Sequence, residues 1–122
     1  MIRLSIIIPH HNQPDLLKIL LDSIGQDDQT QIIVIDDHST QKLDELEALK
    51  KEPQFQSVLF LQAPEGQRGP GCARNLGIEH ATGTHLMFCD SDDYYDLQCC
   101  EKMIATIRQQ DVDVVMCRTQ VH

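Results

Sequence analysis

The sequence lacks long apolar runs and has few basic residues. No apolar stretch approaches the roughly 20 residues of a membrane-spanning helix, and no basic-then-apolar leader opens the chain. We therefore expect a cytoplasmic protein with no transmembrane segment. Ten basic residues stand against nineteen acidic ones, a formal net charge of -9. This charge would repel a phosphate backbone, so we expect no nucleic-acid partner.

The five cysteines form neither a CxxC pair nor a regular framework. Their odd number and uneven spacing favour reduced, mostly buried thiols over disulfides. No two Cys/His pairs have the spacing of a structural zinc site, so we expect no zinc. They are Cys72, Cys89, Cys99, Cys100 and Cys117.

Predicted strands and helices alternate along the 122 residues, a length that suits one domain with a real core. Continuous apolar runs predict strands covered on both faces, with Pro9 ending the first. The predicted strands are 4–8, 32–35, 58–61, 86–89 and 112–117. Short links between strands and helices predict an α/β class: a three-layer α/β/α fold with a mainly parallel, Rossmann-like sheet.

Capping residues and apolar spacing locate the helices. Asn12 is a good N-cap for a helix over 14–24, with Pro14 near its first position. Ser39 or Thr40 can cap a second helix that carries leucines at helical spacing and stops before Pro53. A third helix is predicted through 72–78 and a last one through 97–107.

An apolar run that ends on acids is the most informative motif. Leu86–Cys89 leads into Asp90, Ser91, Asp92 and Asp93. Like charges gathered by a buried strand call for a cation, and Asp92 with Asp90 or Asp93 offers the hard oxygen ligands that Mg²⁺ or Mn²⁺ prefers. A solvated turn is the alternative, because Asp and Ser are ordinary turn residues.

Residues that follow three of the strands should meet at one edge of the sheet. Ligands of parallel α/β sheets lie beyond the carboxyl ends of the strands, where the strand order reverses. That edge would collect residues 10–12, Asp36, Asp37 and residues 90–93. Asp37 could accept a hydrogen bond from a base or ribose, whereas Asp36 could instead be a helix cap before Ser39. This convergence favours a nucleotide with a diphosphate.

A flexible loop over 66–71 could approach a phosphate, with Arg68 or Arg74 pairing with it. The loop is neither a Walker loop nor a G-x-G-x-x-G fingerprint, so Arg68 as an ordinary surface residue stays an alternative. Arg74 could instead tie its helix to the neighbouring loop. His11 could be a packed residue or a nucleotide contact.

Four ordered segments together resemble glycosyltransferase family 2, whose nucleotide-sugar-binding fold is called GT-A. They are residues 5–9 with Asn12, 33–40, 73–78, and 81–83 with 88–93, and they cover nearly all of the chain. The resemblance implies a UDP-sugar donor, a divalent metal, and inverting transfer of the sugar to an acceptor hydroxyl. The acceptor would be a saccharide or a lipid-linked molecule of cell-envelope polysaccharide synthesis, and peripheral attachment at the inner face of the membrane would suit it.

The resemblance also assigns roles. Asp90-Ser91-Asp92 resembles the family's D-x-D motif, in which Asp92 reaches the metal and diphosphate and Asp90 lies near the ribose, with Asp90 a second metal ligand. Asp37 matches the acid that recognises the base, and Pro9 and His11 match positions that flank it. The implied substrate-binding set is Pro9, His11, Asn12, Asp37, Arg68, Arg74, Asp90 and Ser91.

The chain departs from the family pattern at three points. His11 stands where an aromatic residue is common. His38 replaces the glycine of a D-D-G-S-T turn, which the turn tolerates if this position does not demand a positive φ. Family members also continue past the D-x-D segment into an acceptor site with a catalytic base. We therefore expect residues 1–122 to be one donor-binding domain, the N-terminal portion of a longer glycosyltransferase, without a catalytic residue of its own and poorly active alone.

Two other classes of protein remain as alternatives. A haloacid-dehalogenase-like phosphohydrolase also has D-x-D after an apolar strand, but usually on its first strand. A non-catalytic, receiver-like nucleotide-binding module would gather acids after strands one and three, whereas here they follow strands two and four. A homo-oligomer is also open, because a partner chain could cover an edge of the sheet.

Overall fold

A five-stranded parallel sheet organises the computed structural model, which describes residues 4–24, 28–89 and 114–116. The strand order is β3-β2-β1-β4-β5, so the order reverses at β1. The elements are β1 (Leu4–His10), α1 (Pro14–Ile24), β2 (Thr30–Asp36), α2 (Leu43–Lys50), the short 3-10 helix η1 (Pro53–Phe55), β3 (Leu59–Gln62), α3 (Pro70–His80), β4 (His85–Phe88) and β5 (Val114–Met116). The predicted helix through 97–107 lies outside the described residues.

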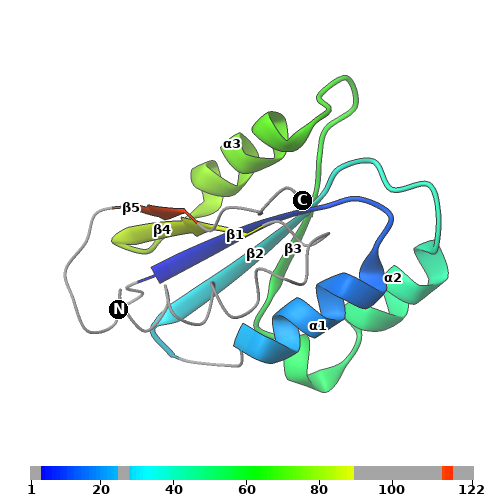
Figure 1. Ribbon diagram of the computed structural model, residues 1–122, viewed down its shortest axis with the longest axis horizontal. Coiled ribbons are helices and arrows are strands. Elements are labelled where there is room, and N and C mark those ends of the chain that lie inside the picture. Colours follow the sequence, from blue (N-terminus) through cyan, green and yellow to red (C-terminus); the bar gives the residue numbers. More distant parts are fainter. Residues whose placement is uncertain (1–3, 25–27, 90–113, 117–122) are drawn as a thin grey trace, which may run out of the picture.

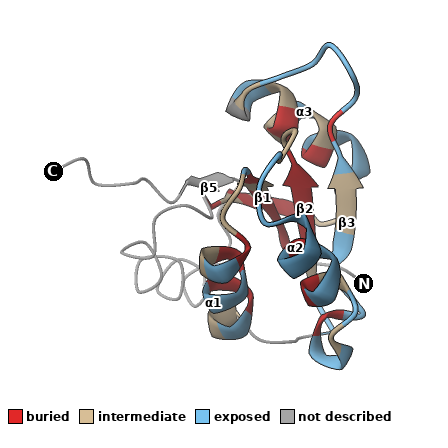
Figure 2. Ribbon diagram, turned by 90° about the vertical axis from the view of Figure 1, so that its right-hand side faces the viewer, coloured by how far each residue is buried: buried red, intermediate tan, exposed pale blue. Residues whose placement is uncertain are grey.

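Helices cover both faces of the sheet, which confirms the predicted three-layer Rossmann-like fold. Figure 1 shows α1 and α2 below the sheet and α3 above it. Side chains alternate along each strand, so Ile6 and Ile8 pack on the α1 and α2 side while Ile7 packs on the α3 side. Buried residues fill β1 and β2, whereas the edge strand β3 is more exposed (Figure 2). The apolar runs of β1 and β2 are thus covered on both faces, as predicted, whereas that of β3 is not, because β3 is an edge strand.

Glycine lets α3 lie close to the sheet. A Cβ added at Gly77 would lie 2.4 Å from Ile7 Cγ2 and 3.0 Å from Ile35 Cδ1. Both distances are shorter than ordinary van der Waals contact, so this position of the helix has no room for a side chain. Gly77 therefore fixes how near α3 packs against β1 and β2.

The prediction that Pro9 ends the first strand was wrong. β1 continues to His10, and Pro9 pairs in register with Ile35 of β2. The carbonyl of Ile7 accepts a hydrogen bond from the backbone N–H of Cys89, so the backbone polar groups of Ile7 point toward β4. Those of Pro9, two residues later in the strand, point the same way. β4 ends at Phe88. The N–H that proline lacks is therefore not needed for pairing with β2.

The predicted caps of α1 and α2 were also wrong. The carbonyl of Gln13 accepts the first helical hydrogen bond of α1, from Leu17, so Asn12 lies one residue before the cap. The residue that precedes α2 is Lys42, in a left-handed conformation with φ 56° and no side-chain cap. Asn12 and Ser39 instead hydrogen-bond at the carboxyl edge of the sheet.

Candidate functional site

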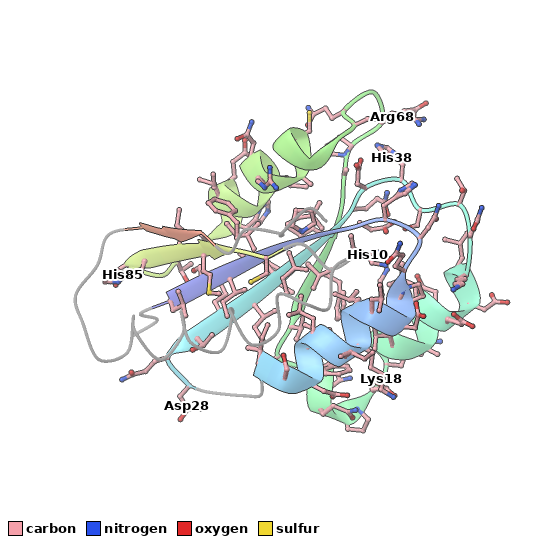
Figure 3. All side chains as sticks on the ribbon, in the orientation of Figure 1. His10, Lys18, Asp28, His38, Arg68 and His85 are labelled. Carbon is pink, nitrogen blue, oxygen red and sulfur yellow. The ribbon has the colours of Figure 1, made fainter. Side chains whose placement is uncertain are left out.

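The loops that follow β1, β2 and β3 leave the sheet at one edge, toward the upper right of Figure 1. Figure 3 shows His10, His38 and Arg68 toward this carboxyl edge, and Asp28 and His85 toward the opposite one. All helices in the described part of the chain are too short or too polar to span a membrane.

A buried His–Asp pair joins the ends of β1 and β2 at this edge. His10 and Asp36 pair in strand register, and Nδ1 of His10 lies 3.0 Å from Oδ1 of Asp36. The other ring nitrogen, Nε2, accepts the backbone N–H of Gln13 at 3.1 Å. Because that N–H can only donate, the proton of the neutral ring lies on Nδ1 and is donated to Asp36. The pair thus connects both strands to the start of α1.

Ser39 completes the environment of Asp36. Its hydroxyl and its backbone N–H both donate to the carboxylate. Burial by itself would raise the pKa of Asp36, but the hydrogen bonds from His10 and Ser39 outweigh burial and hold this pKa below its ordinary value. Asp36 is therefore an ionised structural acid at this edge of the sheet, here called the rim (residues 10–12, 36–39 and 63–69). The predicted alternative of helix capping was wrong, because α2 begins at Leu43, after Lys42, with no side-chain cap.

Asn12 ties the loop after β1 to the loop after β2. Its Oδ1 accepts the backbone N–H groups of Thr40 at 2.7 Å and Gln41 at 2.9 Å. Its own backbone N–H donates to the hydroxyl of Ser39 at 2.9 Å. Asn12 adopts φ 59°, a left-handed conformation that Asn tolerates better than most residues. The side chain thus has a structural role that the sequence did not reveal.

His11 is exposed beside these loops. Its Nδ1 donates to the carbonyl of Asp37 at 2.6 Å, and its Nε2 accepts from the amide of Asn12 at 3.1 Å. Both ring nitrogens are therefore used within the rim, while the exposed ring can still be approached by a ligand. His11 is thus hydrogen-bonded within the rim but exposed, and its contact with a nucleotide stays a prediction.

Asp37 links the end of β2 to the loop before α3. Its two carboxylate oxygens lie 3.0 and 3.2 Å from the backbone nitrogen of Gly69. An ionised carboxylate accepts about four hydrogen bonds, so this contact leaves capacity for a ligand N–H. Arg68, the neighbour of Gly69, is exposed, and its side chain points outward in Figure 3. Asp37 thus holds the loop that carries Arg68 against the end of β2.

His38 replaces the family's glycine at a position that does have a positive φ, so the condition under which the turn would tolerate it without cost is not met. Its φ is 55°, a left-handed conformation that costs a residue with a Cβ about 1 kcal/mol. The imidazole Nε2 lies 2.7 Å from the carbonyl of Gln67 and 3.1 Å from that of Pro64. These contacts oppose the backbone cost and bind the loop before α3.

Of the remaining predicted site residues, some lie in the described part of the chain and the others lie outside it. Arg74 is half-buried in α3, and Pro9 lies at the end of β1. The acid run from Asp90 to Asp93 lies outside the described residues. Cys89, directly before it, donates its backbone N–H to Ile7 of β1 at 3.0 Å. The described part of the chain has no group of three His, Cys, Asp or Glu residues that could hold a metal.

The sequence placed His10 at this edge but did not reveal its bond to Asp36, nor the bonds that Ser39 and His38 make there. His10 offered a signal, because parallel strands that end on a histidine and an acid bring the two side chains together if they share a register. Ser39 and His38 offered none beyond their place in the turn, since their roles depend on loop geometry.

A parallel sheet covered by helices on both faces, with a strand order that reverses at β1, defines a Rossmann-like α/β class of protein. Residues 5–122 match the family model described as Glycosyl transferase family 2. The chain belongs to this family. The match favours the transferase over the phosphohydrolase and receiver-like alternatives.

Named relatives agree with this membership. The poly(ribitol-phosphate) beta-glucosyltransferase of Bacillus spizizenii is 37% identical over 97 residues, covering 75% of this chain and 15% of that protein. TarS of Staphylococcus aureus, a poly(ribitol-phosphate) beta-N-acetylglucosaminyltransferase, is 28% identical over 120 residues, covering 95% and 21%.

Solved structures of TarS share the fold. The crystal structure of its residues 1–349 has a TM-score of 0.65 at 27% identity, covering 88% of this chain and 33% of that one. Its complex with UDP has a TM-score of 0.64 at 26% identity, covering 88% and 32%. The chain therefore spans a third or less of the length of these relatives.

Proposed function

We propose that this chain is the donor-binding part of a glycosyltransferase that takes a UDP-sugar with Mg²⁺ or Mn²⁺. The observation that carries the proposal is the hydrogen-bonded rim at the carboxyl edge, in a chain of family 2. The solved complex of TarS with UDP supports the choice of nucleotide. The relatives are named as poly(ribitol-phosphate) glycosyltransferases, which supports transfer to a hydroxyl of a polymer.

Each rim residue has a defined task in this proposal. Asp37 accepts an N–H of the base, and Pro9 and His11 flank the base. Asn12 holds the two loops that carry them. Arg68 or Arg74 pairs with a phosphate oxygen, since a guanidinium matches that geometry.

The acid run supplies the cation site in this proposal. Asp92 and Asp90 hold the metal, Ser91 lies against the donor, and their oxygen donors match the preference of Mg²⁺ and Mn²⁺. When bound, the cation stabilises negative charge on the departing nucleoside diphosphate. Transfer would be inverting, and the proposal assigns no catalytic base to this chain.

Calorimetric titration of UDP, GDP and dTDP, each with and without Mn²⁺, tests the proposal. We expect UDP to bind most tightly and Mn²⁺ to strengthen its binding. Asp92→Ala should remove most of the Mn²⁺ effect. Asp28→Ala is the matched control, because it removes an exposed carboxylate at the opposite edge of the sheet (Figure 3) and should change nothing. Equal behaviour of the two variants, or no UDP binding, would reject the proposal.

A further inference from the structure

Successive residues at the end of β2 anchor the loop that connects β3 to α3, here called the Arg68 loop (Ala63–Gly69). The backbone N–H of Ala63 donates to the carbonyl of Asp36 at 2.9 Å, which anchors the start of the loop. The backbone N–H of Gly69 donates to the carboxylate of Asp37, which anchors its end. The path between these two points contains Gly66 at φ 85°, where the backbone turns. The loop is thus held at both ends by adjacent residues.

His38 supplies the third anchor, inside the loop. Its Nε2 lies 2.7 Å from the carbonyl of Gln67 and 3.1 Å from that of Pro64. Carbonyls only accept, so this nitrogen carries the proton and donates it. Arg68 consequently lies between two anchored residues, Gln67 on one side and Gly69 on the other. The backbone on both sides of the guanidinium-bearing residue is fixed from the end of β2.

The backbone conformation of His38 is one that a residue with a side chain adopts only at a cost. A φ of 55° disfavours any side chain, and glycine would adopt it freely. A histidine there has a conformational cost that the hydrogen bonds of its ring can offset. The ring does so through the Arg68 loop, and Figure 3 shows His38 and Arg68 on the same side of the molecule.

We propose that His38 is a positioning residue for the donor. Its ring fixes the Arg68 loop before the nucleotide binds, so Arg68 can pair with the diphosphate while the loop stays in place. This proposal rests on the proposed function, because it needs a nucleoside diphosphate at the rim. A fixed loop loses less conformational entropy on binding than a free one. The contribution of Arg68 to affinity therefore depends on His38.

Variants at position 38 separate this role from a purely structural one. His38→Gly removes both hydrogen bonds and also removes the backbone cost, so the melting temperature should change little. UDP binding should weaken by about three- to tenfold, the effect of losing one or two net hydrogen bonds that order the loop. His38→Gln keeps an N–H donor at similar reach and should recover at least half of the lost affinity.

A double-mutant cycle with Arg68→Ala, measured by calorimetric titration of UDP into the full chain, decides the question. We expect Arg68→Ala to weaken binding in the unmodified protein and to weaken it several-fold less in the His38→Gly background. If the two effects simply multiply, or if His38→Gln fails to restore affinity, the His38 proposal is overturned. If the unmodified chain does not bind UDP at all, the proposed function fails and this proposal fails with it.

Discussion

Replacing Gly77 with alanine tests how closely α3 must pack against the sheet. The added Cβ would lie 2.4 and 3.1 Å from Cγ2 and Cγ1 of Ile7, and 3.0 Å from Cδ1 of Ile35. Ile7 and Ile35 are fully buried, so neither can move into solvent. Overpacking of this kind costs about 1–3 kcal/mol, and alanine gains about 1 kcal/mol over glycine in a helix, so we expect a net loss of up to about 2 kcal/mol.

Urea unfolding followed by circular dichroism measures the change in free energy, and thermal unfolding measures the melting temperature. We expect the melting temperature of Gly77→Ala to fall by about 4 °C for each kcal/mol lost. Gly71→Ala is the matched control, since it lies in the same helix and its added Cβ would meet nothing within 4 Å. The reasoning is refuted if Gly77→Ala is as stable as Gly71→Ala.

Two further predictions concern the buried pair at the rim. His10→Ala leaves the Asp36 carboxylate buried with one partner fewer. We therefore expect the free energy of unfolding, measured with urea, to fall by roughly 2–4 kcal/mol. A fall below about 1 kcal/mol would contradict the pairing. The lowered pKa of Asp36 makes its contribution to stability complete above its unfolded pKa of about 3.9 and lost as the pH falls through the lower folded pKa. Unfolding free energies measured from pH 6 to pH 2.5 should show this loss in the unmodified chain and a smaller one in Asp36→Asn, and identical pH profiles would count against it.

The arrangement of strands and helices was predictable because it depends on repeated signals. Ile6, Ile7 and Ile8 form a run that only a strand covered on both faces can bury, and β2 repeats the pattern. Alternation of such runs with amphipathic helices leaves few topologies other than a parallel sheet. The gathering of residues 10–12 with Asp36 and Asp37 at one edge followed from that topology.

The details of the rim could not be predicted because they depend on three-dimensional loop paths. Asn12 is of a residue type that is common at helix caps, yet its side chain bonds to the backbone of Thr40 and Gln41 in the loop after β2. Ser39 likewise bonds to Asp36 and not to the start of α2. Short polar side chains bond to whichever backbone groups lie near, and in a loop that is decided by tertiary packing. For the same reason, the bond between His38 and Gln67 could not be predicted from the sequence.

The proposed function requires that a uridine nucleotide bind at the carboxyl edge of the sheet. Titrating UDP with Mg²⁺ into the ¹⁵N-labelled chain, while following backbone amide chemical shifts, tests it most directly. We expect saturable shifts at Asn12, Asp37 and Gly69. We expect none at Thr82 or Gly83, which hydrogen-bond to Gln31 and Ser5 at the opposite edge. Shifts centred on Thr82 and Gly83, or no shifts at any nucleotide concentration, would contradict it.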